Sequence, residues 1–107
     1  MTNVGLPEVP KGYTWRVYTQ ALPSGVGFIV ALIEPGDSAV GAEEFGMDAA
    51  QASRNDAQQG IYEAAQRIAE SFYAGDEPDG HERLMLNMID LLNLAGDYPP
   101  KTFIKAL

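Results

Sequence analysis

Residues 26–33, which read Val-Gly-Phe-Ile-Val-Ala-Leu-Ile, are apolar at almost every position. A run of this length without polar alternation is typical of a β-strand that is covered on both faces. Such a strand lies inside a sheet, because its backbone needs hydrogen-bonding neighbours on both sides. The sequence therefore predicts a sheet with this segment at its centre.

The flanking segments predict the two neighbouring strands. Residues 13–20 alternate between two sets, namely Tyr13, Trp15, Val17 and, on the other side, Thr14, Arg16, Tyr18, Gln20. This period of two indicates a half-buried strand, with Arg16 and Tyr18 on its exposed face. The link Leu22-Pro23-Ser24-Gly25 joins the fixed φ of proline to a glycine free to take a positive φ, which is typical of a hairpin. A short third strand is expected around residues 38–44.

A long helix is predicted after the sheet. Asp48 stands where an N-cap is wanted, and from Ala50 to Phe72 apolar residues recur at helical spacing before Gly75 ends the pattern. A continuous helix over all the residues between Asp48 and Gly75 would measure about 39 Å, which is long for a domain of this size. We therefore expect a break between Asn55 and Gly60, unless Gly60 instead marks close packing of the helix on the sheet.

The second helix, expected from about His81 to Ala95, is apolar around nearly its whole circumference. A helix of this composition must be buried on most sides, and one sheet with one other helix covers only part of it. We therefore predict an apolar interface made of Leu84, Met85, Met88, Leu91 and Leu92. The amphipathic residues 101–107 are an alternative cover.

These elements define an α+β fold class. The prediction is a small antiparallel sheet of two long strands and a short third, packed by one long helix, broken or continuous, and by a second very apolar helix. Pro7 and Pro10 favour an extended arm over residues 1–12. The 107 residues suffice for one core, so residues 13–107 are expected to form a single domain.

The charge balance restricts the classes of partner. Seven Lys and Arg stand against 15 Asp and Glu, which gives a net charge of -8, and the basic residues are scattered. Direct nucleic-acid binding is not expected, because affinity for phosphate depends on clustered cations. The absence of cysteine, of a signal peptide and of a membrane-spanning run predicts a cytoplasmic protein without membrane contact.

Acidic residues form the candidate polar site. They fall in two groups without Lys or Arg among them, Glu34, Asp37, Glu43, Glu44, Asp48 and then Asp76, Glu77, Asp79. The groups are interpreted as a partner-binding acidic rim that imitates a phosphate backbone or holds a cation, or as a plain solvated surface. Their spacing lacks the glycine and distal glutamate of a calcium loop, and His81 fits the first turn of the second helix.

Catalytic motifs are missing from the sequence. There is no cysteine, one histidine, and no nucleophile elbow, zinc-protease motif, P-loop or dinucleotide fingerprint. The prediction is therefore a protein that is not an enzyme and that needs no cofactor or metal.

The element order resembles a known family. From Trp15 to Phe72, two strands, a third with Gly41 and an Ala-rich helix containing Ala57 and Ile61 resemble the pseudo-RNase-H module of HicB-type antitoxins. Residues from His81 onward do not read as the DNA-binding part of such antitoxins. The resemblance implies a non-catalytic acidic protein that masks a basic partner, often as an oligomer.

The expected function is thus an acidic protein-interaction or inhibitor module that binds a basic protein partner and forms homo-oligomers. Bacterial or phage antitoxins, anti-defence or host-takeover proteins and nucleic-acid mimics are of this kind. The alternatives are a self-assembling structural subunit, such as a small virion component, and a carboxylate-based metal- or ligand-binding enzyme.

Overall fold

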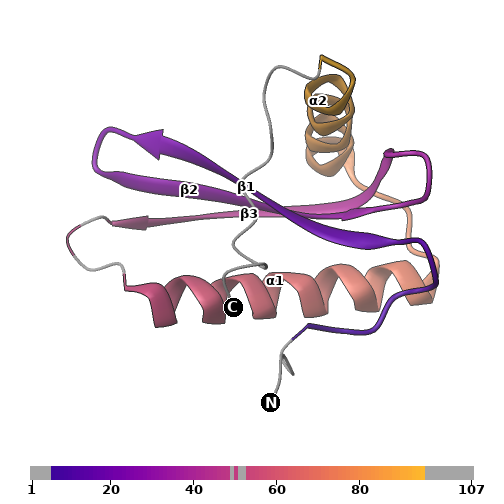
Figure 1. Cartoon of the computed structure of the whole chain (residues 1–107), viewed down its shortest axis with the longest axis horizontal. Coiled ribbons are helices and arrows are strands. Elements are labelled where there is room, and N and C mark those ends of the chain that lie inside the picture. Colours follow the sequence, from indigo (N-terminus) through magenta and orange to yellow (C-terminus); the bar gives the residue numbers. More distant parts are fainter. Residues whose placement is uncertain (1–5, 49, 51–52, 96–107) are drawn as a thin grey trace.

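The computed structural model describes residues 6–48, 50 and 53–95. Three strands, β1 (Thr14–Leu22), β2 (Gly25–Ile33) and β3 (Ala39–Asp48), form an antiparallel sheet in the order β1-β2-β3. Helices α1 (Arg54–Ala74) and α2 (Gly80–Ala95) follow and lie on opposite faces of this sheet (Figure 1). The fold is therefore α+β, as predicted.

Strand β2 occupies the centre of the sheet, which confirms the interpretation of its apolar run. Phe28, Val30 and Leu32 are buried in the core beneath α1, whereas Ala31 and Ile33 are buried in the core beneath α2. Successive side chains of a strand point to opposite faces, so a strand between two helices must be apolar throughout.

Strand β3 corrects the expectation of a short third strand, because its 10 residues make it the longest of the three. Its sequence hides this length, since it mixes two glycines with three acidic residues. Glu43 is nevertheless accommodated on the α1 face, where its carboxylate accepts a hydrogen bond from Nε of Arg67 at 2.6 Å.

The β1–β2 hairpin lies where the sequence places it, with Leu22 opposite Gly25 in the last cross-strand pair. Its conformation differs from the expected one. Within the described part of the chain, φ is positive only at Gly12, Gly36, Asp37 and Gly75, so the hairpin closes without the freedom of Gly25.

Helix α1 begins later than predicted and is unbroken over its 21 residues. Ser53, not Asp48, is its N-cap, and the Ser53 hydroxyl accepts a hydrogen bond from the backbone N–H of Asp56 at 3.1 Å. Asp48 instead ends β3. With this start the helix is about 31 Å long, which fits the 37 Å extent of the domain without a bend.

Gly60 inside α1 and Gly75 just after its last residue have roles that the sequence suggests. A Cβ added at Gly60 would stand 2.7 Å from the ring of Phe45, so the close-packing interpretation of this glycine is confirmed. Gly75 adopts the left-handed conformation, with φ of 75°, and ends the helix.

Two apolar cores result, one on each face of the sheet. Trp15 and Val17 pack against Ile61 and the alanines of α1, while Tyr18 packs against Met85 and Ile89 of α2. The expectation that Tyr18 is exposed is therefore wrong, since α2 covers it and leaves it only 4% accessible.

The segment before β1 runs along the α1 side of the domain. The indole N–H of Trp15 donates a hydrogen bond to the carbonyl of Pro7 at 3.2 Å, and the Tyr73 hydroxyl donates to the carbonyl of Glu8 at 2.9 Å. The division into an arm of residues 1–12 and a domain of residues 13–107 stays a prediction. The amphipathic residues 101–107 lie outside the described residues.

Candidate functional site

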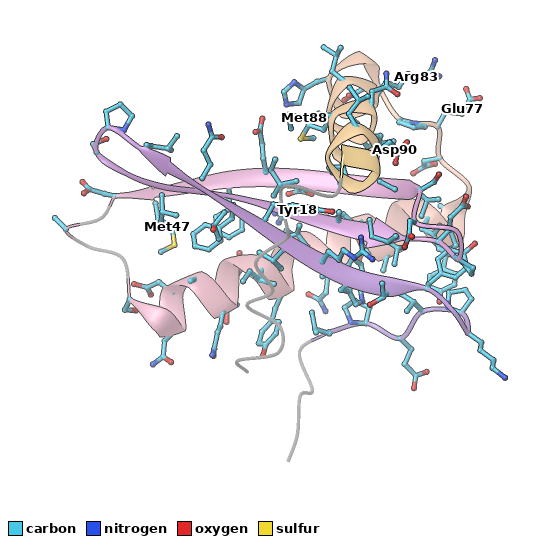
Figure 2. The ribbon with its side chains drawn as sticks, turned by 45° about the horizontal axis from the view of Figure 1, so that its top comes forward. Tyr18, Met47, Glu77, Arg83, Met88 and Asp90 are labelled. Carbon is cyan, nitrogen blue, oxygen red and sulfur yellow. The ribbon has the colours of Figure 1, made fainter. Side chains whose placement is uncertain are left out.

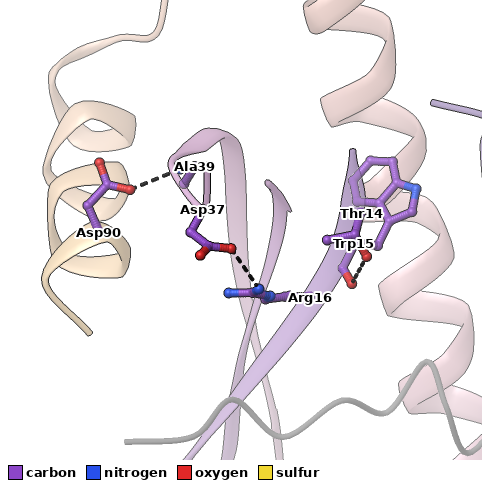
Figure 3. A network of polar contacts seen from close by, with 6 residues as sticks. All are labelled: Thr14, Trp15, Arg16, Asp37, Ala39 and Asp90. Atoms are coloured by element: carbon purple, nitrogen blue, oxygen red, sulfur yellow. Dashed lines mark hydrogen bonds and ion pairs between the residues drawn. The ribbon is translucent and has the colours of Figure 1, made fainter. Parts of the chain in front are cut away.

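Helix α2 is held on the sheet by two carboxylates as well as by apolar packing. The backbone N–H groups of Ala39 and Ala42 in β3 donate hydrogen bonds to Asp90 Oδ1 at 2.9 Å and to Glu82 Oε2 at 3.2 Å (Figure 3 shows the first of these). A strand at the edge of a sheet would otherwise leave such groups unpaired. These contacts fix which side of α2 meets the sheet.

The opposite side of α2 exposes three large apolar side chains. Leu84 is 69%, Met88 41% and Leu91 67% accessible. They stand at positions i, i+4 and i+7, so they lie along one side of the helix. We call these three residues the apolar strip.

Three residues of the predicted apolar interface are exposed, namely Leu84, Met88 and Leu91, and their role in binding stays a prediction. Met85 is wrongly included, because at 7% accessibility it belongs to the core beneath α2. A side chain at this position points toward the sheet, whereas that of Leu84, one residue earlier, is turned by about 100°. The side chain of Leu92 lies outside the described part of the chain.

A groove adjoins the apolar strip on the α2 face of the sheet. It has a volume of about 380 Å³, and Met88 forms its wall on α2. Its other walls and floor come from the hairpin end of the sheet and include Leu22, Gly27, Ile29, Glu44 and Gly46. We call this hollow the glycine groove.

The groove and the strip are on the same side of α2. In Figure 2, Met88 points toward the β1–β2 hairpin, whereas Arg83 and Asp90 lie on the other side of the helix. Leu22 is 42% accessible and forms part of the groove. Met88 therefore belongs to both the apolar strip and the groove, and Leu22 is the second exposed large apolar side chain that borders the groove.

Gly27 and Gly46 in this groove have more space around them than Gly41, another glycine of the sheet. Gly27 and Gly46 are directly opposite each other in β2 and β3. A Cβ would be 3.5 Å from Leu22 at Gly27 and 3.8 Å from it at Gly46, which are ordinary contacts, whereas at Gly41 it would be 2.7 Å from Ile68. Neither Gly27 nor Gly46 has a positive φ. The packing of the domain thus does not require glycine at either position.

The predicted acidic rim does not form one site. Glu34 and Asp37 lie at the β2–β3 turn, Asp48 at the other end of β3, and Asp76 and Glu77 in the α1–α2 connection. Glu43 and Asp79 line a polar hollow of about 400 Å³ bordered by Arg67 and His81, and Asp76 and Glu77 line a separate hollow of about 160 Å³.

Several of these carboxylates have partners that are distant in the sequence. Asp37 forms an ion pair with Arg16 at 3.2 Å (Figure 3), and Glu44 Oε1 lies 2.8 Å from His81 Nε2. Asp79 has a local partner instead. It accepts a hydrogen bond from the backbone N–H of Glu82 at 2.8 Å and so caps α2.

The cleft between α1 and α2 has more acidic than basic groups, because Arg67 and His81 face four carboxylates, those of Glu43, Glu70, Asp79 and Glu82. Arg67 forms an ion pair with Glu43, and their hydrogen bond raises the pKa of Arg67 above its ordinary value. Among the residues that the structure describes, no three His, Asp or Glu side chains are grouped so that they could hold a metal ion. Three of the carboxylates in this cleft, those of Glu43, Asp79 and Glu82, make contacts within the domain.

The sequence reasoning missed the glycine groove. The signal was present, because a glycine inside a strand packs no side chain and often marks a place where another backbone or a ligand comes close. The cross-strand pairing of Gly27 with Gly46 becomes visible only when the register of β2 and β3 is known.

Comparisons of the chain with protein-family models, with curated proteins and with solved structures find no match. The described helices include none that is long and apolar enough to cross a membrane. The order of three strands and two helices agrees with the element order on which the antitoxin resemblance was based, and no family is identified by it.

Proposed function

We propose that this chain is a non-catalytic, acidic protein-interaction domain that binds its partner through the apolar strip. The observation that carries this proposal is the exposure of Leu84, Met88 and Leu91 along one side of α2. Single exposed leucines are common on protein surfaces and need no explanation. Three along one side of a helix, beside an apolar groove, are typical of an interaction surface. Binding a partner removes their apolar area from water, which is favourable.

The charge of the chain supports a basic partner. With a net charge of -8, the domain attracts positively charged proteins and repels acidic ones. Such complementarity raises the rate of encounter and selects the partner, while the apolar strip supplies affinity. Antitoxins, anti-defence or host-takeover proteins, nucleic-acid mimics and other inhibitors of basic proteins share this combination.

Self-association is the second candidate, and the same apolar strip favours it, since two copies can bury their α2 helices against each other. The charge of -8 on each copy opposes such pairing. Size-exclusion chromatography with light scattering separates the two candidates. A dimer that dissociates in the Leu91→Gln variant would favour a self-assembling structural subunit.

The proposal is tested by affinity capture with two matched variants. Leu91 is 67% accessible on α2 and Tyr73 is 61% accessible on α1, so Leu91→Gln and Tyr73→Gln remove similar exposed apolar groups from different surfaces. We expect a basic protein to be captured by the wild type and by Tyr73→Gln, and lost with Leu91→Gln. Capture should weaken at high salt, because the attraction between opposite charges is screened. Equal capture by all three proteins would contradict the proposal.

A further inference from the structure

The two faces of the sheet are covered to different extents. Helix α1 runs along one face for its full 21 residues. On the other face, α2 covers Tyr18 and its neighbours but not the end of the sheet next to the hairpin, where the glycine groove lies. Among the elements that the structure describes, no helix covers this end of the face.

The uncovered area has the width of a helix. It begins at the row Tyr18–Ile29–Glu44, where α2 covers Tyr18 and Ile29 is half-buried, and extends along the strands to the row at Leu22 and Asp48. Four residues of a strand span about 13 Å, and an α-helix with its side chains is about 10–12 Å across. One further helix thus fits beside α2, between the apolar strip and the hairpin.

The floor and the rim of the groove indicate the chemistry of that helix. The facing glycines Gly27 and Gly46 add no side chains to the floor, and the side chain of Leu22 lies beside both of them, so a helix would pack on Leu22 above the glycines. Leu22, Ile29 and Met88 offer apolar contacts. Among the described residues that line the groove, Glu44 is the one charged residue; its side chain is 50% accessible, and its Oε1 lies 2.8 Å from Nε2 of His81.

We propose that the glycine groove binds a basic amphipathic α-helix of the partner protein, which packs its apolar face on Met88, Ile29 and Leu22 and directs a Lys or Arg to Glu44. This inference rests on the proposed function, and it specifies the partner's binding element. A second copy of the chain is a poorer occupant, because the charge of -8 on each copy opposes the contact. Helices bind in this way through apolar residues at i, i+3, i+4 and i+7.

The test uses synthetic peptides of about 18 residues, long enough to form a helix. The first has leucines at i, i+3, i+4 and i+7 and lysines elsewhere. The second replaces each lysine by glutamate, and the third scrambles the first. We expect the first to bind about tenfold more tightly than either control, as measured by calorimetry. Nuclear magnetic resonance should show shifts at Gly27, Gly46 and Met88.

Substitutions in the groove test whether the peptide binds at this site. A Cβ at Gly46 would make only ordinary contacts, the nearest 3.8 Å from Leu22, so Gly46→Gln should fill part of the groove and weaken peptide binding about tenfold without lowering the melting temperature. Met88→Gln tests the opposite wall if Gly46→Gln does not fold. Glu44→Gln should weaken binding about threefold or more, and the effect should decrease as salt is added. Tyr73→Gln is the control that leaves binding unchanged.

Equal binding of the scrambled peptide would overturn the inference, and so would unchanged binding of the first peptide to Gly46→Gln. Resonance shifts confined to the outer edge of β3 would also overturn it, because they would indicate that the peptide adds a strand to the sheet. These failures are distinct from failure of the proposed function. Partner capture that depends on Leu91 but not on Gly46 would preserve the interaction domain and reject the helix in the groove. Capture that is independent of Leu91 would reject the proposed function itself.

Discussion

Two substitutions on α2, only two residues apart, should differ sharply in their effect on stability. Ile89 is fully buried beneath the helix, and Leu91 is 67% accessible on its outer side. Truncating a buried isoleucine to alanine removes its contacts and leaves a cavity, at a cost of about 2–5 kcal/mol. Burying a whole leucine side chain contributes about 1.5–3 kcal/mol, so the covered third of Leu91 contributes about 0.5–1 kcal/mol.

Urea unfolding of Ile89→Ala and Leu91→Ala measures this contrast. Far-UV circular dichroism reports both helices, and fluorescence of the single tryptophan, Trp15, reports the core beneath α1. We expect Ile89→Ala to lose at least about 2 kcal/mol of unfolding free energy and Leu91→Ala about 1 kcal/mol or less. Since 1 kcal/mol corresponds to roughly 4–8 °C for a domain of this size, Ile89→Ala should lower Tm by more than about 8 °C.

Equal losses for the two variants would refute the assignment of the buried and exposed sides of α2. The measurement is repeated at several protein concentrations, because burial of Leu91 between two copies would make its loss concentration-dependent. Equal losses at every concentration leave no such explanation.

Three further predictions concern the rest of the fold. Ser53→Ala should cost about 1 kcal/mol, because it removes the N-cap of α1, and Asp48→Ala should cost less in the same urea titration; the reverse order would place the helix start at Asp48. Gly60→Ala should lower Tm, because the new Cβ would stand 2.7 Å from the ring of Phe45. Overpacking of this kind costs about 1–3 kcal/mol, against a gain of about 1 kcal/mol in helix propensity. A higher Tm would show that the ring moves aside without cost. Glu43→Gln should change the unfolding free energy by less than about 1 kcal/mol, because its partner Arg67 is largely exposed, and the difference should shrink in salt; a larger, salt-independent loss would contradict this.

Much of the fold follows from local patterns in the sequence. The apolar run of β2 identifies a central strand, and Pro23 and Ser24 mark the hairpin between two strands. Gly75 marks the end of α1 in the same way. These features depend on residues that are close in the sequence, so they can be recognised without tertiary information.

The errors arise where distant residues decide the outcome. Asp48 and Ser53 are both suitable N-caps, and the extension of β3 along β2 as far as Asp48 selects Ser53. The length of β3 was underestimated because acidic residues are rare in strands. Glu43 and Glu44 are matched by Arg67 and His81, which lie 24 and 37 residues further along the chain.

The candidate site was predicted in composition but not in geometry. The sequence of α2 indicates surplus apolar surface, yet it does not distinguish Leu84 from Met85. That choice depends on the hydrogen bonds of Glu82 and Asp90 with the backbone of β3. The acidic residues predicted as one rim are distributed over the surface, and those at positions 37, 43 and 79 are engaged within the domain.

The central claim, that the outer side of α2 binds a basic protein, is tested most directly by photo-crosslinking in cells that produce the chain. A benzophenone amino acid replaces Leu91 in one variant and Tyr73 in the other, two positions of similar accessibility on opposite faces of the domain. We expect a covalent adduct with a Lys- and Arg-rich protein from position 91 and none from position 73. Adducts of equal yield from both positions, or none from position 91, would contradict it.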